Sequence, residues 1–138
     1  MLPYLLNRVS SRANQLWVKT LREHGLTIGR WQVLSVLSQF DGSRVGTIAD
    51  LSGGEQPAVS RVIDQMERDG LVRRRPALDD SRAVQVWNTA GGRELFEQLM
   101  PYAEGFVERM VRTLSDQEIN DMTSCLERLF SDLQEDGS

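Results

Sequence analysis

The chain contains very little of the chemistry that metal centres and nucleophilic active sites need. Among its 138 residues there is one cysteine, Cys125, and one histidine, His24. A single cysteine excludes an internal disulfide, and two such residues far apart in the chain are too few for a zinc site or a Cys/His nucleophilic pair. We therefore expect no metal, no cofactor and no enzymatic activity. The scarcity of cysteine also favours a reducing, cytoplasmic compartment.

Long hydrophobic stretches are also missing. The longest apolar run falls far short of the roughly 20 residues that a membrane-spanning helix requires, and the N-terminal segment MLPYLLNRVSSR has no cationic leader before its apolar residues. Repeats and low-complexity blocks are absent, and glycine and serine are spread among turns. These absences predict a single domain over residues 1–138, in the cytoplasm and with no membrane partner.

The chain lacks net positive charge as well. Its 16 Lys and Arg residues are outnumbered by 20 Asp and Glu residues, which gives a formal net charge of −4. That balance alone disfavours a nucleic-acid partner. The charges are segregated, however, because residues 1–30 hold five cations and one acid, whereas residues 101–138 hold three arginines and nine acids. Binding to DNA would therefore depend on where the cations are placed.

What the sequence does contain is helical periodicity at both ends. Apolar residues recur at three- and four-residue spacing, which predicts an amphipathic helix over residues 3 to about 24, closed by Gly25, and a long helix from near Thr89. A capping box, SDQE at 115–118, opens a last helix. We expect the apolar faces of these helices to be buried. Cys125 lies on such a face, which predicts a buried thiol.

The central part predicts three shorter helices. The first covers TIGRWQVLSVLSQF with Thr27 as its N-cap, and the second, IADLS, can be capped by Thr47. A turn with GG at 53–54 leads into a longer helix that begins near Pro57 and has its apolar residues on one face. The polar residues of that longer helix lie on the opposite face: Gln56, Pro57, Ser60, Arg61, Asp64 and Arg68. This succession is the pattern of a helix-turn-helix.

Beyond Gly70 the period of the apolar residues changes from helical to alternating. The segments LVRRR and AVQVW, joined by the polar turn PALDDSR, predict a two-stranded ribbon. On such a strand Arg73 and Arg75 share one face and Arg74 points to the other, which makes Arg74 the best suited to a structural contact. A helix-turn-helix followed by a ribbon is a winged helix, so we expect a mainly α fold with a small β-hairpin wing. Its arginines can approach phosphates and the minor groove.

These segments resemble the MarR family of bacterial transcription regulators. The matching stretches are LTIGRWQVL at 26–34, TIADLSGGEQPAVSRVIDQMERDGLVRR at 47–74, DDSRAVQV at 79–86 and NTAGGREL at 88–95. The resemblance implies a winged-helix DNA-binding lobe over residues 27–88, with dimerisation helices over residues 1–24 and 89–134. It further implies a homodimer that binds double-stranded DNA at a near-palindromic operator, usually as a repressor that a small molecule releases.

The resemblance also implies roles for single residues. The predicted DNA contacts are Thr47, Gln56, Pro57, Ser60, Arg61, Arg73, Arg75 and Arg82, of which the resemblance itself implies Gln56, Pro57, Ser60, Arg61 and Arg82. Among them, Arg82 takes the wing-tip position for the minor groove. Asp64 is expected to pair with a wing arginine, although an ordinary surface acid paired along its own helix fits equally well. Asp80 is expected to hold Arg82 within the turn. One position departs from the family pattern, because Asn88 stands where leucine is general.

An effector of aromatic or anionic character is predicted to bind in a cleft between the dimerisation helices and the winged lobe. The candidate lining residues are Arg8, Arg12, Arg30 and Trp31, although aromatic residues at helical spacing also suit a plain core. Two other functions fit the same pattern, a winged-helix module for protein–protein contact and an effector-independent architectural DNA binder. The salt dependence and the sequence preference of DNA binding distinguish the three.

Overall fold

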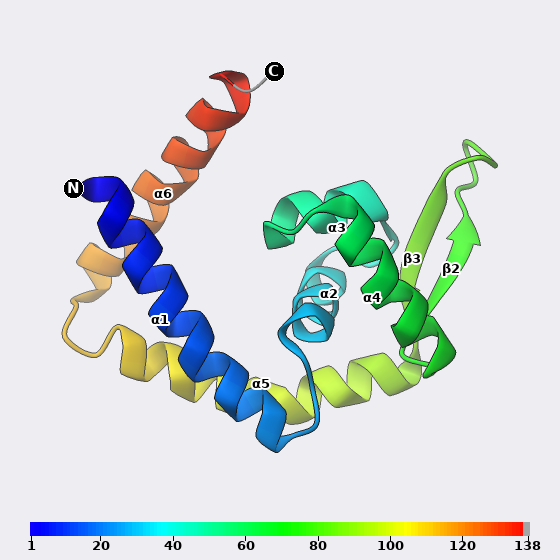
Figure 1. Cartoon of the computed structure of the whole chain (residues 1–138), viewed down its shortest axis with the longest axis horizontal. Coiled ribbons are helices and arrows are strands. Elements are labelled where there is room, and N and C mark those ends of the chain that lie inside the picture. Colours follow the sequence, from blue (N-terminus) through cyan, green and yellow to red (C-terminus); the bar gives the residue numbers. More distant parts are fainter. Residues whose placement is uncertain (137–138) are drawn as a thin grey trace. The chain divides into compact units, whose positions relative to one another are not determined.

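A computed structural model describes residues 1–136 and confirms the mainly helical fold with a small β wing (Figure 1). The elements of this part of the chain are, in order, α1 (Leu2–Glu23), α2 (Ile28–Gln39), β1 (Ser43–Arg44), α3 (Val45–Ser52), α4 (Gln56–Arg68), β2 (Val72–Pro76), β3 (Val84–Asn88), α5 (Ala90–Met110) and α6 (Asp116–Asp136). They form two compact units, Met1–Ala103 and a second one from Glu104 onward. No helix among the described residues has the length and apolar character to cross a membrane.

The core of the first unit lies where α2, α3, α4 and the sheet meet. Its largest fully buried side chains include Leu34, Leu37, Ile48, Ile63, Met66, Val72 and Val86. The apolar face predicted for α4 is confirmed, since Val59, Ile63 and Met66 are buried there. Phe40 and Leu51 are apolar but exposed. Phe40 is the residue that caps α2, outside the last turn, and the inward partner of Ile48 in α3 is Ala49.

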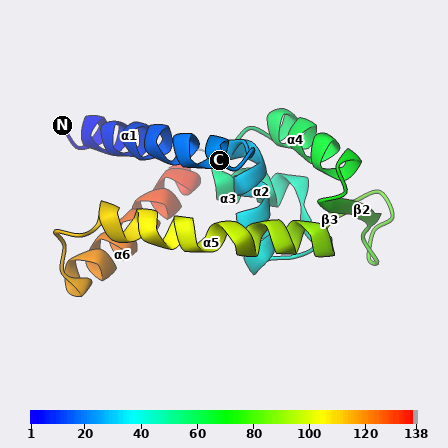
Figure 2. The same cartoon turned by 90° about the horizontal axis from the view of Figure 1, so that it is seen from below.

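An aromatic stack joins α1, α2 and the first part of α5. The Trp31 ring of α2 meets Trp17 of α1 edge-on, with centroids 5.2 Å apart, and stacks on Phe96 of α5 at 5.1 Å. Figure 2 shows α2 between these two helices. Such aromatic pairs add to the free energy of burying the rings.

The N-cap predicted at Thr27 is confirmed, because its Oγ1 accepts the backbone N–H of Arg30 at 3.3 Å.

The sheet has three antiparallel strands in the order β1-β3-β2, so the prediction of a two-stranded ribbon was incomplete. The added strand, β1, pairs Ser43 with Val86 and Arg44 with Gln85. Two residues are too short to show an alternating pattern in a sequence. Because α3 follows β1 at once and begins at Val45, Thr47 lies inside the helix and is not its N-cap as predicted.

The terminal helices leave much of their apolar surface uncovered. In α1 only Trp17 and Leu21 are buried, and α6, which the structure describes completely, buries no residue. The capping box is confirmed, since Ser115 Oγ and Glu118 Oε1 each accept the other residue's backbone N–H, at 3.1 and 3.0 Å. The prediction that these faces are buried is wrong for a single chain. Cys125, predicted to be buried, is likewise exposed, because α6 meets no element that covers it within its own unit.

Candidate nucleic-acid interface

The outer face of α4 carries the residues predicted to meet DNA. Gln56, Pro57 and Arg61 are exposed and Ser60 is half-buried, while Thr47 is exposed on α3. Pro57 occupies the first turn of α4, where its missing N–H and fixed φ favour a helix start. The polar face points away from the core because the apolar face of the same helix is buried there. A helix presented in this way has dimensions that fit the major groove, which is about 12 Å wide.

Arg74 of β2 fastens the ribbon to α4. Its Nη1 lies 2.6 Å from Asp64 Oδ1 and 3.4 Å from Glu67 Oε1. Its Nη2 donates to the Ser60 carbonyl at 3.2 Å and to Ser60 Oγ at 3.4 Å, and its backbone N–H donates to Glu67 Oε2 at 2.9 Å. The side chain is only 23% exposed, so solvent screens these pairs less than it would at the surface. Arg74 therefore holds wing and helix in one fixed arrangement, and it is the wing arginine that pairs with Asp64.

The tip of the wing is a closed turn that presents Arg82 to solvent. Ala77 N–H donates to the Ala83 carbonyl at 2.9 Å and closes the ribbon. Within the turn, Asp80 Oδ1 accepts the Arg82 backbone N–H at 3.0 Å and lies 3.6 Å from Arg82 Nε. The Arg82 side chain is 92% exposed. Asp80 thus shapes the backbone at the tip, and the guanidinium of Arg82 projects from it.

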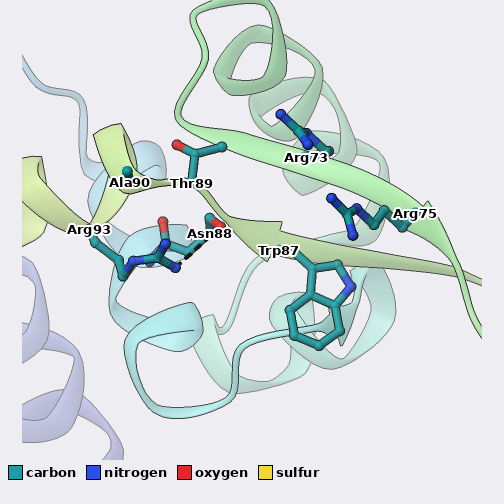
Figure 3. Close-up of a pocket in the computed structure, with 7 residues that line it drawn as sticks. All are labelled: Arg73, Arg75, Trp87, Asn88, Thr89, Ala90 and Arg93. Atoms are coloured by element: carbon teal, nitrogen blue, oxygen red, sulfur yellow. Dashed lines mark hydrogen bonds between the residues drawn. The ribbon is translucent and has the colours of Figure 1, made fainter.

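The face of the ribbon away from α4 contains Arg73 and Arg75. Both are exposed, and neither makes an ion pair with any described residue. They line a cavity of about 240 Å³ together with residues of β3, the β3–α5 connection and α5 (Figure 3). The two arginines therefore do not share a surface with the polar face of α4. If they contact DNA, it is from the flank of the wing.

The residues proposed for the effector lie on α1 and α2. Arg8 is exposed on α1, and Arg12 on the same helix donates to Gln15 at 3.4 Å. Arg30 is 2.6 Å from Asp69, the residue that caps the C-terminal end of α4. Trp31 belongs to the aromatic stack with Trp17 and Phe96. Three of the four candidates, Arg12, Arg30 and Trp31, thus have partners inside the first unit. Arg30 is linked directly to the C-terminal end of α4.

Several contributing residues escaped prediction. Glu67 forms a second ion pair with Arg74. It could have been predicted because it lies one helical turn after Asp64, on the same face. The ion pair between Arg44 and Asp79, at 3.5 Å, links β1 to the wing turn and depends on a strand that no pattern revealed. Among the described residues there is no group of three His, Cys, Asp or Glu side chains placed to hold a metal ion.

Similarity to known proteins agrees with this geometry. Residues 26–84 match the model of the MarR family. The chain is 26% identical over 131 residues to the HTH-type transcriptional repressor IacR of Pseudomonas putida, covering 95% of this chain and 78% of the relative. A MarR-family transcriptional regulator from Silicibacter pomeroyi is 31% identical, with a TM-score of 0.85 over 94% of this chain and 88% of the other.

A third similarity is of fold. Bordetella bronchiseptica BpsR, whose DNA binding is regulated by 6-hydroxynicotinic acid, superposes with a TM-score of 0.81 over 93% of this chain and 97% of the other, at 23% identity. The Silicibacter regulator is similar enough in sequence, over nearly the whole of both chains, to establish kinship. The chain therefore belongs to the MarR family of transcriptional regulators, a family of DNA-binding proteins and not of enzymes.

Proposed function

We propose that this regulator is a homodimeric repressor that binds a near-palindromic operator and is released by a small aromatic or anionic effector. One observation carries the proposal: Arg74 forms ion pairs with Asp64 and Glu67 and a hydrogen bond with Ser60. It fixes the ribbon beside α4, so that a helix suited to the major groove and an exposed arginine suited to the minor groove belong to one rigid body. The repressor named IacR, similar along most of its length, supports the direction of regulation.

Dimerisation is supported by the apolar surface of the terminal helices. Leu2, Leu5 and Val9 are exposed on α1, and Leu126 and Phe130 are exposed on α6. Exposed apolar side chains at helical spacing form a continuous stripe, and soluble proteins usually cover such a stripe with a partner. A second copy of the chain is the occupant that a near-palindromic operator requires, because the symmetry of the protein then matches that of the DNA.

The DNA contacts proposed for single residues follow from which side chains are exposed. Gln56, Pro57, Ser60 and Arg61 contact bases and phosphates in the major groove, and Arg82 enters the minor groove. Ser60 keeps a hydroxyl proton to donate although its Oγ already accepts from Arg74. Thr47, Arg73 and Arg75 contact phosphates.

Two arginine variants test this division. Arg82→Ala should weaken binding to every sequence, whereas Arg61→Ala should also change which sequences are preferred. The measurement is fluorescence anisotropy on a selected operator and on random duplexes, repeated over a series of salt concentrations. A steep salt slope with sequence preference is expected. No binding at low salt would instead favour a protein–protein module, and equal affinity for all sequences would favour an architectural DNA binder.

Release by an effector is proposed to act through Arg30. A carboxylate bound among Arg8, Arg12, Arg30 and Trp31 would compete with Asp69 for the Arg30 guanidinium, and Asp69 ends the recognition helix. Such a ligand lowers DNA affinity only by preferring a dimer whose recognition helices are mis-spaced relative to major grooves about 34 Å apart. The compound that regulates BpsR, 6-hydroxynicotinic acid, is a suitable first probe. It should shift the operator titration of the wild type, and this shift should shrink in Arg30→Gln.

A further inference from the structure

A second binding site lies on the face of the wing opposite α4. Its cavity, about 240 Å³, is lined by Arg73, Arg75, Trp87, Asn88, Thr89, Ala90 and Arg93 (Figure 3). We propose that this wing pocket binds a small single-ring aromatic carboxylate. The site is distinct from the polar face of α4 and from the candidates on α1 and α2, but it shares Arg73 and Arg75 with the proposed phosphate contacts. It can be tested without DNA, so it stands or falls separately from the proposed function.

The charge of the wing pocket comes from three arginines on two elements. Arg73 and Arg75 have no acidic partner among the described residues. Arg93 is held only loosely, 3.9 Å from Asp41 Oδ2 and 3.5 Å from the Asn88 carbonyl. Asp41 is also engaged elsewhere, because its Oδ1 accepts the Asn88 backbone N–H at 2.8 Å. The pocket therefore has an excess of positive charge, and guanidinium groups match the planar geometry of a carboxylate.

The apolar wall of the wing pocket is the indole of Trp87. Trp87 pairs with Arg73 across the antiparallel ladder, which places the two side chains on the same face of the sheet. Gly42 leaves room for the ring. It has φ +80°, and a Cβ on it would lie 2.5 Å from the indole, so only glycine lets the ring sit there. With 37% of Trp87 exposed, a flat ligand can stack on the indole while its carboxylate meets the arginines.

The size of the wing pocket limits the ligand. Cavities for drug-sized ligands begin at about 300 Å³, whereas a cavity of about 150 Å³ is enough for benzene. The wing pocket, at about 240 Å³, lies between these values. It has room for one ring with a carboxylate.

The wing pocket lies on the side of the ribbon that faces away from α4. Arg74 points toward α4 and contacts Ser60 and Asp64, so its neighbours Arg73 and Arg75 point the other way. A DNA phosphate carries similar charge but has no ring to place against Trp87. The aromatic carboxylate uses both the cations and the indole, which is why we favour it.

The test follows the indole N–H signals of the three tryptophans, Trp17, Trp31 and Trp87, by NMR. Sodium benzoate, sodium cyclohexanecarboxylate and inorganic phosphate are titrated separately into the full chain at constant ionic strength, without DNA. The expected result is a saturable shift of the Trp87 signal with benzoate and weaker binding of the other two anions. Trp87→Phe assigns the signal. A shift of Trp31 alone would place the carboxylate in the α1–α2 cleft and overturn the wing pocket.

Arginine variants complete the test. Arg73→Gln with Arg75→Gln, and separately Arg93→Gln, should each weaken benzoate binding about tenfold or more, since each removes charge-assisted hydrogen bonds. Arg22→Gln, an exposed arginine of α1, is the matched control and should leave the affinity unchanged. Unaltered backbone amide spectra show that the variants are folded. Equal affinity for phosphate and benzoate, a Trp87 signal that only duplex DNA shifts, or no loss in the arginine variants would overturn the proposal.

Discussion

Helices α4 and α6 are both amphipathic, but only the apolar face of α4 is covered by other elements of the chain. The apolar face of α4 is covered by α2 and α3, and Ile63 in it is 0% exposed. The apolar face of α6 has no cover within its own unit, and Phe130 in it is 55% exposed. Periodicity alone gives the same prediction for both helices, because it shows which face is apolar and not what lies against it. One helix therefore belongs to the fold of the single chain, whereas the other is available to an assembly.

The largest effect is expected from the covered helix. Ile63→Ala should lower the free energy of unfolding by about 2–5 kcal/mol, because it leaves a cavity in a packed core. Urea denaturation at a fixed protein concentration measures the change, since unfolding is linked to assembly in the proposed dimer. Val62→Ala, at a half-buried neighbour, is the control and should cost less than half as much. Equal losses at the two positions would show that the full burial of Ile63 does not decide its contribution to stability.

The second largest effect is expected in α6, where a substitution on the exposed apolar face should weaken dimerisation. Phe130→Ala should weaken dimerisation by about 2 kcal/mol, or roughly 30-fold in the dissociation constant, as expected for a buried aromatic anchor. Sedimentation equilibrium measures it, and Asp132→Ala on the same helix is the control. A wild-type chain that remains monomeric at micromolar concentration would contradict the proposed dimer.

A smaller effect is expected at the contact between α4 and the wing. Asp64→Asn should lower operator affinity by about 1 kcal/mol, because Arg74 keeps Glu67 but loses its shortest ion pair. The variant also removes a negative charge near DNA, which by itself raises affinity. Asp50→Asn, an exposed acid on α3, measures that opposite contribution. If both variants bind operator more tightly than the wild type, the ion pair between Asp64 and Arg74 does not contribute to DNA binding.

The smallest effect is expected at the wing turn. The Arg44–Asp79 pair is exposed on both sides, at 50% and 79%. Asp79→Asn should therefore change the free energy of unfolding by less than about 0.5 kcal/mol, as is usual for surface ion pairs. Thermal denaturation in low and high salt provides the measurement. A loss above about 1 kcal/mol, the upper end for exposed pairs, would show that this link to β1 supports the sheet.

Most of the fold could be predicted from local patterns. The cap at Thr27, the capping box at 115–118 and the buried face of α4 each depend on residues close in sequence, where spacing determines contact. Strand β1 could not be predicted, because two residues carry no period. The exposure of Cys125 and of the α6 stripe was also missed, because burial depends on what the rest of an assembly supplies.

The candidate site was predicted unevenly for a similar reason. The alternation of side chains along β2 separated Arg74 from Arg73 and Arg75, and the contacts of Arg74 with α4 agree with that separation. The wing pocket escaped because it joins β2, β3 and the start of α5 through pairings between distant parts of the chain. The roles assigned to the DNA-contacting residues remain predictions.

The hold of α4 on Arg74 has a consequence for how such a regulator can be switched. A ribbon bound at three points of the helix cannot swing away from it without breaking several charged contacts together. Within one protomer, the distance between α4, proposed for the major groove, and the wing tip, proposed for the minor groove, is therefore constant. In the proposed dimer, the adjustable quantity is the distance between the two protomers' DNA-binding surfaces. Control of operator occupancy would then act through the geometry of the pair.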